Sequence, residues 1–126
     1  MQATKKETVQ KIIDSFSSTD KEAFMAFCTE DVRWAMVGMF DKTGKEAIRE
    51  LMKADQDMPQ DPPDIRMGNF ITEGDKVVST GTMTMKNKKG DPIDYSFCDI
   101  YTFEGEKVKE MESYVVEHKA NPEHEN

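Results

Sequence analysis

The sequence predicts an α+β domain in which three N-terminal helices pack on a curved, mostly antiparallel sheet. Two observations carry this prediction. The first half of the chain contains three Thr residues that are each followed three positions later by Glu, which is the capping-box pattern of a helix N-terminus. The second half contains four alternating segments separated by short turn sequences. Helices followed by consecutive strands are typical of the α+β class, with the helices on one face of the sheet.

Each Thr-x-x-Glu pair marks the start of one predicted helix. The pairs are Thr4 with Glu7, Thr19 with Glu22, and Thr43 with Glu46. They predict a first helix over residues 4–17 and a short second helix over residues 20–28. In the first helix, Val9, Ile12, Ile13 and Phe16 have the spacing of one buried stripe. The third helix follows Thr43, and its apolar positions are Ala47, Ile48, Leu51 and Met52.

One strand is predicted between the second and third helices. Its alternating residues are Val32, Arg33, Trp34, Ala35 and Met36. We expect Trp34 and Met36 to face inward, because successive strand residues point to opposite faces. Residues 38–44 are predicted to form a loop into the third helix. The segment DQDMPQDPPD behind that helix contains three prolines, so it is predicted to be a surface connection.

Four further strands are predicted in the second half of the chain. They lie at about residues 64–72, 75–86, 92–104 and 107–117, and the turn sequences EGD, KKGDP and EGE separate them. The more apolar face of the second of these strands consists of Val77, Ser79, Gly81, Met83 and Met85. Small residues on this face leave room beside the Met side chains, so we expect an incompletely filled interior.

The last strand has two possible inward faces. Met111, Ser113 and Val115 are uncharged, and we assign them to the interior. The alternative face would bring Glu112 and Tyr114 into the pocket, together with Glu110 and Val116.

An acid occupies the apolar face of the 92–104 strand. The stretch YSFCDIYTF places Asp99 on the same side as Tyr95, Phe97, Tyr101 and Phe103. A carboxyl in an apolar site finds a partner, takes up a proton or faces a wet cavity. Asp99 is therefore either a pocket acid that orients a ligand, or a buried structural group bonded to a Tyr hydroxyl or to Ser113. Its pKa should lie above that of a free Asp if desolvation dominates, and below it if several donors face it.

Composition and charge exclude several function classes. With 126 residues the chain fits one domain, which we place at residues 1–118, followed by a polar tail at 119–126. A net charge of −8 argues against nucleic acid as a partner. No stretch is apolar enough to cross a membrane, and no secretory signal is recognisable. Cys28 and Cys98 are expected to be reduced thiols, which points to the cytoplasm. We expect no cofactor and no metal, because clustered His and carboxylate ligands are missing.

The outward face of the sheet is mixed rather than strongly charged, and we expect it to form a homodimer interface. Its residues include Thr80, Thr82, Thr84, Cys98, Ile100 and Tyr114.

The order of these elements resembles the NTF2-like superfamily, particularly its SnoaL-like and ketosteroid-isomerase-like branches, over about residues 5–117. The segments STDKEAFMAFCTEDVRW, TGKEAIRELM, GDKVVSTGTMTM and DYSFCDIYTFEGEKVKEMESYVVE carry the resemblance. It implies a cone-shaped barrel with a pocket between sheet and helices, and frequently a homodimer. Asp99 matches the isomerase position that holds a protonated aspartic acid, which donates a hydrogen bond.

The other catalytic positions implied by the resemblance are not matched. The isomerase tyrosine falls at about Ile12, and its general-base aspartate falls at about Met36 or Ala35. The polyketide cyclase branch uses an Asp or His near the pocket, but the two histidines here, His118 and His124, lie in the polar tail.

Our leading hypothesis is therefore a SnoaL-like protein that binds a small apolar or carbonyl-containing ligand. Asp99 is the expected catalytic or anchoring group, and the expected ligand contacts are Trp34, Met36, Met83, Phe97, Tyr101, Met111 and Ser113. The first alternative is an isomerase or cyclase-type lyase with Asp99 as general acid and Tyr95, Tyr101 or Glu112 as second group. The second is a dimeric interaction module without a ligand, whose cavity should admit nothing beyond water.

Overall fold

The fold is taken from a computed structural model that describes residues 4–17, 21–54, 63–87 and 89–118. Its three helices are α1 (Lys5–Ser17), α2 (Lys21–Ala26) and α3 (Lys45–Ala54). Its strands are β1 (Cys28–Met36), β2 (Phe40–Thr43), β3 (Asp64–Glu73), β4 (Lys76–Lys86), β5 (Pro92–Glu104) and β6 (Lys107–Glu117). The α+β class is confirmed, and the four strands predicted in the second half agree with β3 to β6 to within one residue at each end.

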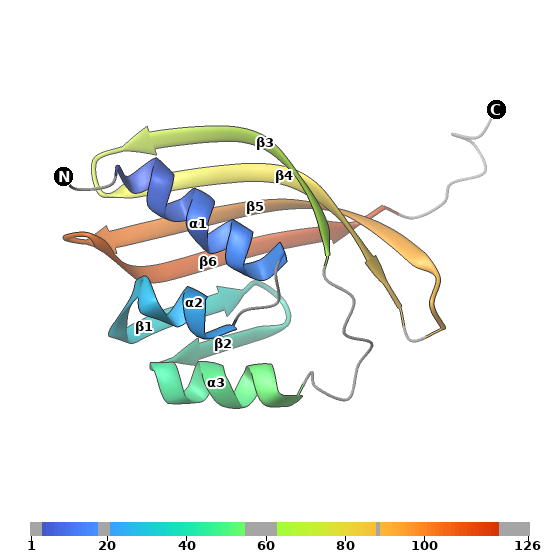
Figure 1. The fold of residues 1–126 in the computed structure, drawn as a ribbon, viewed down its shortest axis with the longest axis horizontal. Coiled ribbons are helices and arrows are strands. Elements are labelled where there is room, and N and C mark those ends of the chain that lie inside the picture. The colour runs from blue at the N-terminus through green and yellow to red at the C-terminus, as the bar shows by residue number, and fades with distance from the viewer. Residues whose placement is uncertain (1–3, 18–20, 55–62, 88, 119–126) are drawn as a thin grey trace.

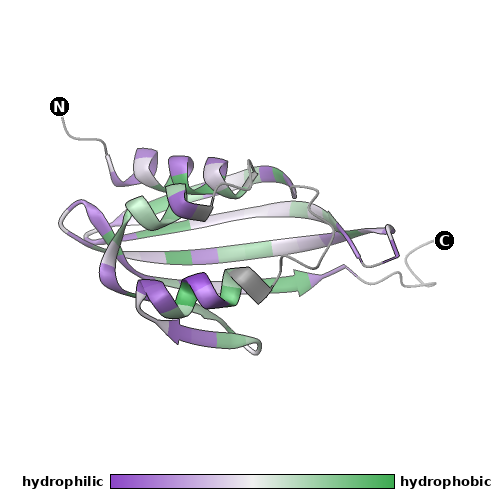
Figure 2. Ribbon diagram, turned by 60° about the horizontal axis from the view of Figure 1, so that its bottom comes forward, coloured by the Kyte–Doolittle hydropathy of each residue, from purple (hydrophilic) through white to green (hydrophobic). Residues whose placement is uncertain are grey.

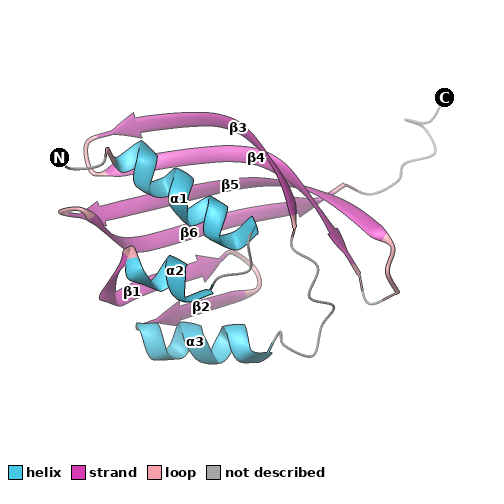
Figure 3. Ribbon diagram, in the orientation of Figure 1, coloured by secondary structure: helices cyan, strands magenta, loops and turns pink. Residues whose placement is uncertain are grey.

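The six strands form one sheet in the order β2-β1-β6-β5-β4-β3. Neighbours pair antiparallel, except that β1 and β6 run parallel. The sheet is curved, and the helices lie on one side of it (Figures 1 and 3). Helix α1 contacts β3 and β4, α2 contacts β1, and α3 lies along β1 and β2. None of the helices that the structure describes lies on the other face of β3 to β6.

The core lies between the helices and the covered face of the sheet. Its helical residues include Val9, Ile12, Ile13, Phe24, Met25 and Ile48. Its strand residues include Val32, Val77, Tyr101, Phe103, Val108 and Met111. Hydrophilic and hydrophobic residues alternate along α1 and α3 (Figure 2), as expected for helices that bury one stripe. Among the described residues, no helix is both long and apolar enough to cross a membrane.

The predicted capping boxes had three different outcomes. The first is confirmed in part, because the Glu7 backbone N–H donates to Thr4 Oγ1 at 3.1 Å. The second depends on Thr19, which lies outside the described residues. The third is wrong: Thr43 ends strand β2, and α3 begins at Lys45 after Gly44. Strand pairing holds Thr43 extended opposite Arg33 on β1, so Thr43 is one residue too early to cap the helix.

Strand β2 corrects the prediction that residues 38–44 form a loop. Residues Phe40 to Thr43 pair with β1 and make a hairpin between α2 and α3, so the three helices do not follow one another. Only four residues long, β2 has little apolar alternation of its own. Its pairing is supported across the strands by Arg33, whose guanidinium donates to both carboxylate oxygens of Asp41 at 2.9 and 2.7 Å.

The assignments of strand faces are confirmed. On β5, Phe97, Asp99, Tyr101 and Phe103 are all buried. On β6, Met111 and Ser113 are buried, whereas Tyr114 and Val116 have 41% and 65% of their surface exposed. The alternative face of β6 therefore points away from the helices.

Candidate functional site

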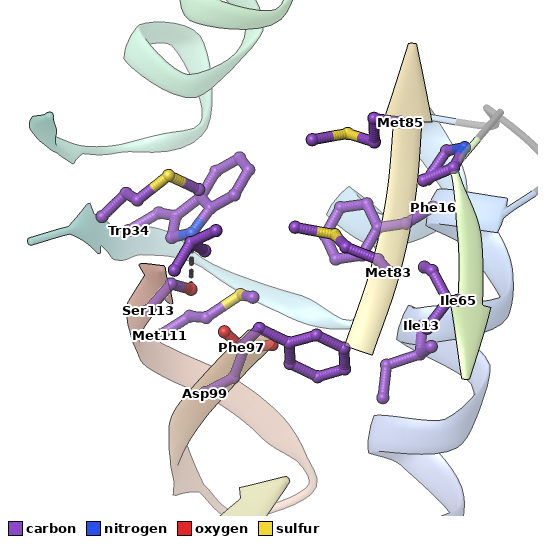
Figure 4. A pocket seen from close by; sticks show the side chains of 13 residues that line it. Ile13, Phe16, Trp34, Ile65, Met83, Met85, Phe97, Asp99, Met111 and Ser113 are labelled. Atoms are coloured by element: carbon purple, nitrogen blue, oxygen red, sulfur yellow. Dashed lines mark hydrogen bonds between the residues drawn. The ribbon is translucent and has the colours of Figure 1, made fainter. Parts of the chain in front are cut away.

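A cavity of about 280 Å³ lies between the covered face of the sheet and α1 (Figure 4). Two of its lining residues come from α1 and one precedes β3: Ile13, Phe16 and Pro63. The strands contribute Trp34, Met36, Ile65, Met83, Met85, Phe97, Asp99, Met111, Ser113 and Val115. All but Asp99 and Ser113 have apolar or aromatic side chains. The cavity is near the lower end of the size range of small-molecule pockets, about 300–1,000 Å³.

This volume contradicts the expectation attached to the ligand-free interaction module. One water molecule takes up about 30 Å³ of the liquid. A cavity of about 280 Å³ is several times larger. It has room for more than water, which the interaction-module hypothesis did not predict.

Two small residues on β4 lie opposite Phe97 and Asp99 on β5. Gly81 pairs with Phe97, and a Cβ atom at Gly81 would lie 2.7 Å from the Phe97 ring and 2.5 Å from the Arg66 carbonyl oxygen. The absence of a side chain therefore lets the Phe97 ring lie against β4. Ser79, the next inward residue, pairs directly with Asp99 and is too short to cover its carboxyl.

Asp99 lies in a row of three polar residues across the sheet. It pairs with Ser79 on β4 and with Ser113 on β6, and only 8% of its surface is exposed. Burial raises the pKa of the Asp99 carboxyl from its ordinary 3.8 to about 6. The Ser113 and Tyr101 hydroxyls act in the opposite direction. Desolvation therefore dominates, which was the first of the two outcomes considered from sequence.

Two buried hydroxyls near Asp99 remain unsatisfied. Among the described residues, the hydroxyls of Ser79 and Tyr101 have no hydrogen-bond partner of ordinary geometry. Both nevertheless lie within reach of hydrogen bonding, since hydrogen bonding by Tyr101 lowers the pKa of Asp99 and hydrogen bonding by Ser79 lowers that of Tyr101. We interpret this as proximity rather than as formed hydrogen bonds. The row of polar groups thus has hydrogen-bonding capacity that the protein itself does not use.

Trp34 forms a fixed wall of the cavity. Its indole N–H donates to Ser113 Oγ at 3.3 Å (Figure 4), which leaves the Ser113 proton available toward Asp99. The indole packs on the rings of Phe16, Phe24 and Phe40, with centroids 6.0, 5.6 and 5.1 Å away. Phe40 belongs to the strand that sequence analysis missed. The hairpin therefore helps to orient the largest side chain of the site.

Seven of the eight residues singled out from the sequence line this one cavity. They are Trp34, Met36, Met83, Phe97, Asp99, Met111 and Ser113. Tyr101 does not line it, because it is fully buried in the core behind Asp99. The other six lining residues were not among those predicted from the sequence: Ile13, Phe16, Pro63, Ile65, Met85 and Val115. The inward faces assigned to β4 and β6 already contained Met85 and Val115, whereas no sequence pattern marked Pro63 as a lining residue.

Two of the three expected partners for acid–base chemistry lie elsewhere, whereas Tyr101 lies beside Asp99 but does not line the cavity. Tyr95 and Glu112 are not among the lining residues, and Glu112 accepts a hydrogen bond from Tyr114 on the opposite face. The His118 ring is 2.6 Å from Ser96 Oγ, also on that face, and His124 lies outside the described residues. Within the described lining, Asp99 is the one group that can exchange a proton near neutral pH. The arrangement can bind an apolar body and hold one polar group.

The described residues contain no group of three or more His, Cys, Asp or Glu side chains that could hold a metal ion.

Comparison with known proteins identifies relatives. The chain matches the family model described as SnoaL-like domain over residues 9–111. No curated protein matches it. Among solved structures, it is similar to an NTF2-like protein of unknown function from Burkholderia pseudomallei K96243. The two are 20% identical over 89% of this chain and 90% of that one, with a TM-score of 0.80.

Two other similar structures carry more specific names. TerC, co-crystallised with polyporic acid, is 22% identical over 86% of this chain and 88% of that one, with a TM-score of 0.77. A putative SnoaL-like polyketide cyclase from Jannaschia sp. CCS1 is 18% identical over 88% of this chain and 84% of that one, with a TM-score of 0.75. At these identities the similarity shows a shared fold.

Proposed function

The chain belongs to the SnoaL-like domain family, and we propose that it binds a small, mostly apolar molecule in its cavity, with Asp99 as the polar anchor. In this proposal the curved sheet and the helices form the cone-shaped barrel of that family, and residues 1–118 are its single domain. One observation carries the proposal: a carboxyl that is 8% exposed faces a cavity of about 280 Å³ whose other walls are almost entirely apolar.

A buried, ionised Asp99 beside unfilled space is unfavourable for the stability of the fold. A carboxyl whose pKa rises from 3.8 to about 6 on folding costs about 3 kcal/mol when it is ionised. The unfilled space beside it forgoes dispersion contacts as well. Natural proteins retain such features mostly where they serve function. A purely structural polar cluster would be expected to satisfy its own hydrogen bonds, but among the described residues the hydroxyls of Ser79 and Tyr101 beside Asp99 have no hydrogen-bond partner.

The side chains that line the cavity can adapt to the shape of an apolar ligand. Met36, Met83, Met85 and Met111 line it, and Met side chains adapt readily to irregular apolar surfaces. Rigid aromatic walls at Trp34 and Phe97 complement them. The name of TerC adds support, because a protein of this fold was crystallised with a small organic molecule, polyporic acid.

Two measurements test the proposal. Native mass spectrometry of the purified protein should detect a co-purified small molecule. Calorimetric titration with 2-naphthalenemethanol, an apolar probe with one hydroxyl, should show binding to the wild type. Val115→Phe fills part of the cavity and should weaken this binding at least tenfold. Val116→Phe is the matched control, since the neighbouring residue is 65% exposed and points outward. If the probe binds both variants as it binds the wild type, or if the wild type binds neither this probe nor one with the same apolar body and another polar group, the proposal is wrong.

One observation favours an isomerase or cyclase-type lyase as a second candidate. The pKa of about 6 places Asp99 within reach of proton exchange at neutral pH, as a general acid requires. Against this candidate, the described lining supplies no second group for proton transfer. Any activity found should have a pH–rate profile with a group that Asp99→Asn abolishes. A profile unchanged by that substitution would exclude Asp99 as the acid.

We also propose that the protein forms a homodimer through the sheet face that no helix covers. This face presents exposed Ile71, Tyr114 and Val116, at 59%, 41% and 65%, beside half-buried Cys98 and Ile100. Light scattering coupled to size-exclusion chromatography at micromolar concentration should give twice the monomer mass. A measured mass equal to that of one chain would contradict the homodimer proposal.

A cytoplasmic location is proposed on the basis of the cysteines. Both Cys28 and Cys98 are free thiols. Burial raises the pKa of the Cys28 thiol to about 12, so that this thiol is protonated and unreactive. Free thiols are typical of reducing compartments.

A further inference from the structure

The charge of Asp99 is unmatched within its cavity. Figure 4 shows the carboxyl among the lining side chains, beside Phe97 and Met111. Among the lining residues that the structure describes, none is Lys, Arg or His. With 8% of its surface exposed, the carboxyl has little access to water either. A buried charge is normally paired, so a matching cation is the missing element of this site.

No titratable neighbour supplies a positive charge. On β5, Tyr101 and Cys98 flank the carboxyl, and both have a raised pKa, so both are neutral at pH 7. Cys28, which acts on Tyr101, is neutral for the same reason. From β4 and β6 the neighbours are the hydroxyls of Ser79 and Ser113. The lining residues from α1, β1 and β3 are uncharged.

The cavity walls suit a cation that is attached to an apolar body. Trp34, Phe16 and Phe97 contribute aromatic rings, whose faces attract cations. Trp34 is held in place by its hydrogen bond to Ser113 and by the ring of Phe40. The net charge of −8 raises the local concentration of cations around the protein as a whole.

We propose that the ligand of this cavity is an apolar or aromatic amine, whose ammonium group pairs with the ionised Asp99 carboxylate while its body fills the space between Trp34, Phe97 and the Met side chains. This inference rests on the proposed function and specifies its ligand class.

The protonation state of the free protein agrees with this ligand class. A pKa of about 6 leaves Asp99 mostly ionised at pH 7. A carbonyl ligand that accepts a hydrogen bond would need the protonated acid, and its binding would therefore weaken as the pH rises. An ammonium group instead pairs with the form that is already present. The Ser113 and Tyr101 hydroxyls, which favour the ionised carboxyl, act in the same direction.

Three probes with one apolar body test the inference. They are 2-naphthylmethylamine, 2-naphthalenemethanol and 2-naphthoate, which carry an ammonium, a hydroxyl and a carboxylate. Calorimetric titration of the full chain at about pH 7.5 should rank them in that order, with the amine at least tenfold tighter than the alcohol. Lowering the pH to about 5 should weaken amine binding about tenfold, since Asp99 is then mostly protonated. Binding of the alcohol should change far less.

Two variants connect the preference to Asp99. Asp99→Asn keeps the shape of the side chain and removes its charge, so the amine should bind no more tightly than the alcohol. Glu104→Gln makes the same change in net charge at an exposed position of β5 and should leave the preference intact. An Asp99→Asn protein that still favours the amine, or a wild type that favours the alcohol, would overturn the inference while the proposed apolar pocket stands. If none of the three probes binds, the proposed function fails and this inference with it.

Discussion

Polar side chains are paired on one face of strands β3 to β6 and only partly paired on the other. On the outer face, polar side chains satisfy one another: Arg66 donates to Thr82, Thr84 and Asp64, Thr84 donates to Asp94, and Tyr114 donates to Glu112. On the inner face, Asp99, Ser79 and Tyr101 gather at one place, and the hydroxyls of Ser79 and Tyr101 have no partner among the described residues.

In the free protein, the polar groups of the outer face are therefore hydrogen-bonded, whereas those of the inner face are only partly so. Exposed polar groups can always exchange partners with water, so their pairing contributes little to stability. Buried polar groups lack that option, and each unmet hydrogen bond costs about 1–3 kcal/mol. The inner face would gain from a ligand that satisfies these groups, whereas the outer face would not.

The largest effect is expected from filling the inner face at Gly81. Gly81→Val places side-chain atoms within 2.5 Å of the Arg66 carbonyl oxygen and 2.7 Å of the Phe97 ring. The free energy of unfolding should fall by about 3 kcal/mol or more. Thr82→Val, one residue along on the outer face, is the matched control and should change it by less than about 1 kcal/mol. Urea unfolding followed by Trp34 fluorescence measures both. Equal effects would mean that Phe97 does not pack against β4.

Removing the charge of Asp99 should stabilise the fold at neutral pH. The folded-state pKa of about 6 lies above the ordinary value of 3.8, so the stability associated with protonated Asp99 is fully present below about pH 4 and is lost as the pH rises through 6. Asp99→Asn should therefore raise the free energy of unfolding by up to about 3 kcal/mol at pH 8 and have little effect at pH 4.

Chemical denaturation of both proteins at several pH values measures this difference. The control is Asp94→Asn on the outer face of the same strand. Asp94 accepts a hydrogen bond from Thr84 and is exposed, and its substitution should give no such rise. A gain from Asp99→Asn that is the same at every pH would show that ionisation is not its cause.

Removing the hydroxyl of two different tyrosines should change the stability of the fold in opposite directions. The Tyr101 hydroxyl is buried without a hydrogen-bond partner among the described residues, so Tyr101→Phe should stabilise the fold by about 1 kcal/mol. The Tyr114 hydroxyl donates to Glu112 at the surface, and Tyr114→Phe should lower stability slightly. Midpoints of thermal unfolding compare the two variants with the wild type. If Tyr101→Phe is clearly destabilising, its hydroxyl has a partner in solution, and the inner face is less incomplete than we infer.

The smallest effect should come from the outer ion pair that supports β2. Asp41→Asn removes the negative charge and one of the two acceptor oxygens of the Arg33 guanidinium, which pairs with Glu110 as well. Both side chains are well exposed, so solvent and salt screen the pair and unfolding should change little. The Trp34 fluorescence spectrum is the more sensitive measure. A marked shift would show that this pair, through β2 and Phe40, positions the indole.

The faces of the strands could be predicted from sequence because side chains alternate strictly along a strand. That rule grouped the residues of each strand into two faces, and the more apolar or uncharged face was assigned to the interior. Together these steps placed Asp99, Ser113 and Met83 on the helix side of the sheet, where the structure has them. It did not identify β2, because Phe40 to Thr43 is too short and too polar to show a pattern of its own. It also did not select Phe16, whose position at the end of the α1 stripe is that of an ordinary core residue.

By itself, the sequence determined which residues share a face, since that depends only on neighbours along the chain. Only the tertiary structure decided how deep each lies. Tyr101 and Asp99 are two residues apart on the same face, yet Tyr101 is packed in the core and Asp99 faces the cavity. The difference arises from where the helices lie on the curved sheet. They cover the position of Tyr101 and leave that of Asp99 open to the cavity. For the same reason, the unmatched charge of Asp99 became visible only when the side chains around it, from six different elements, were brought together.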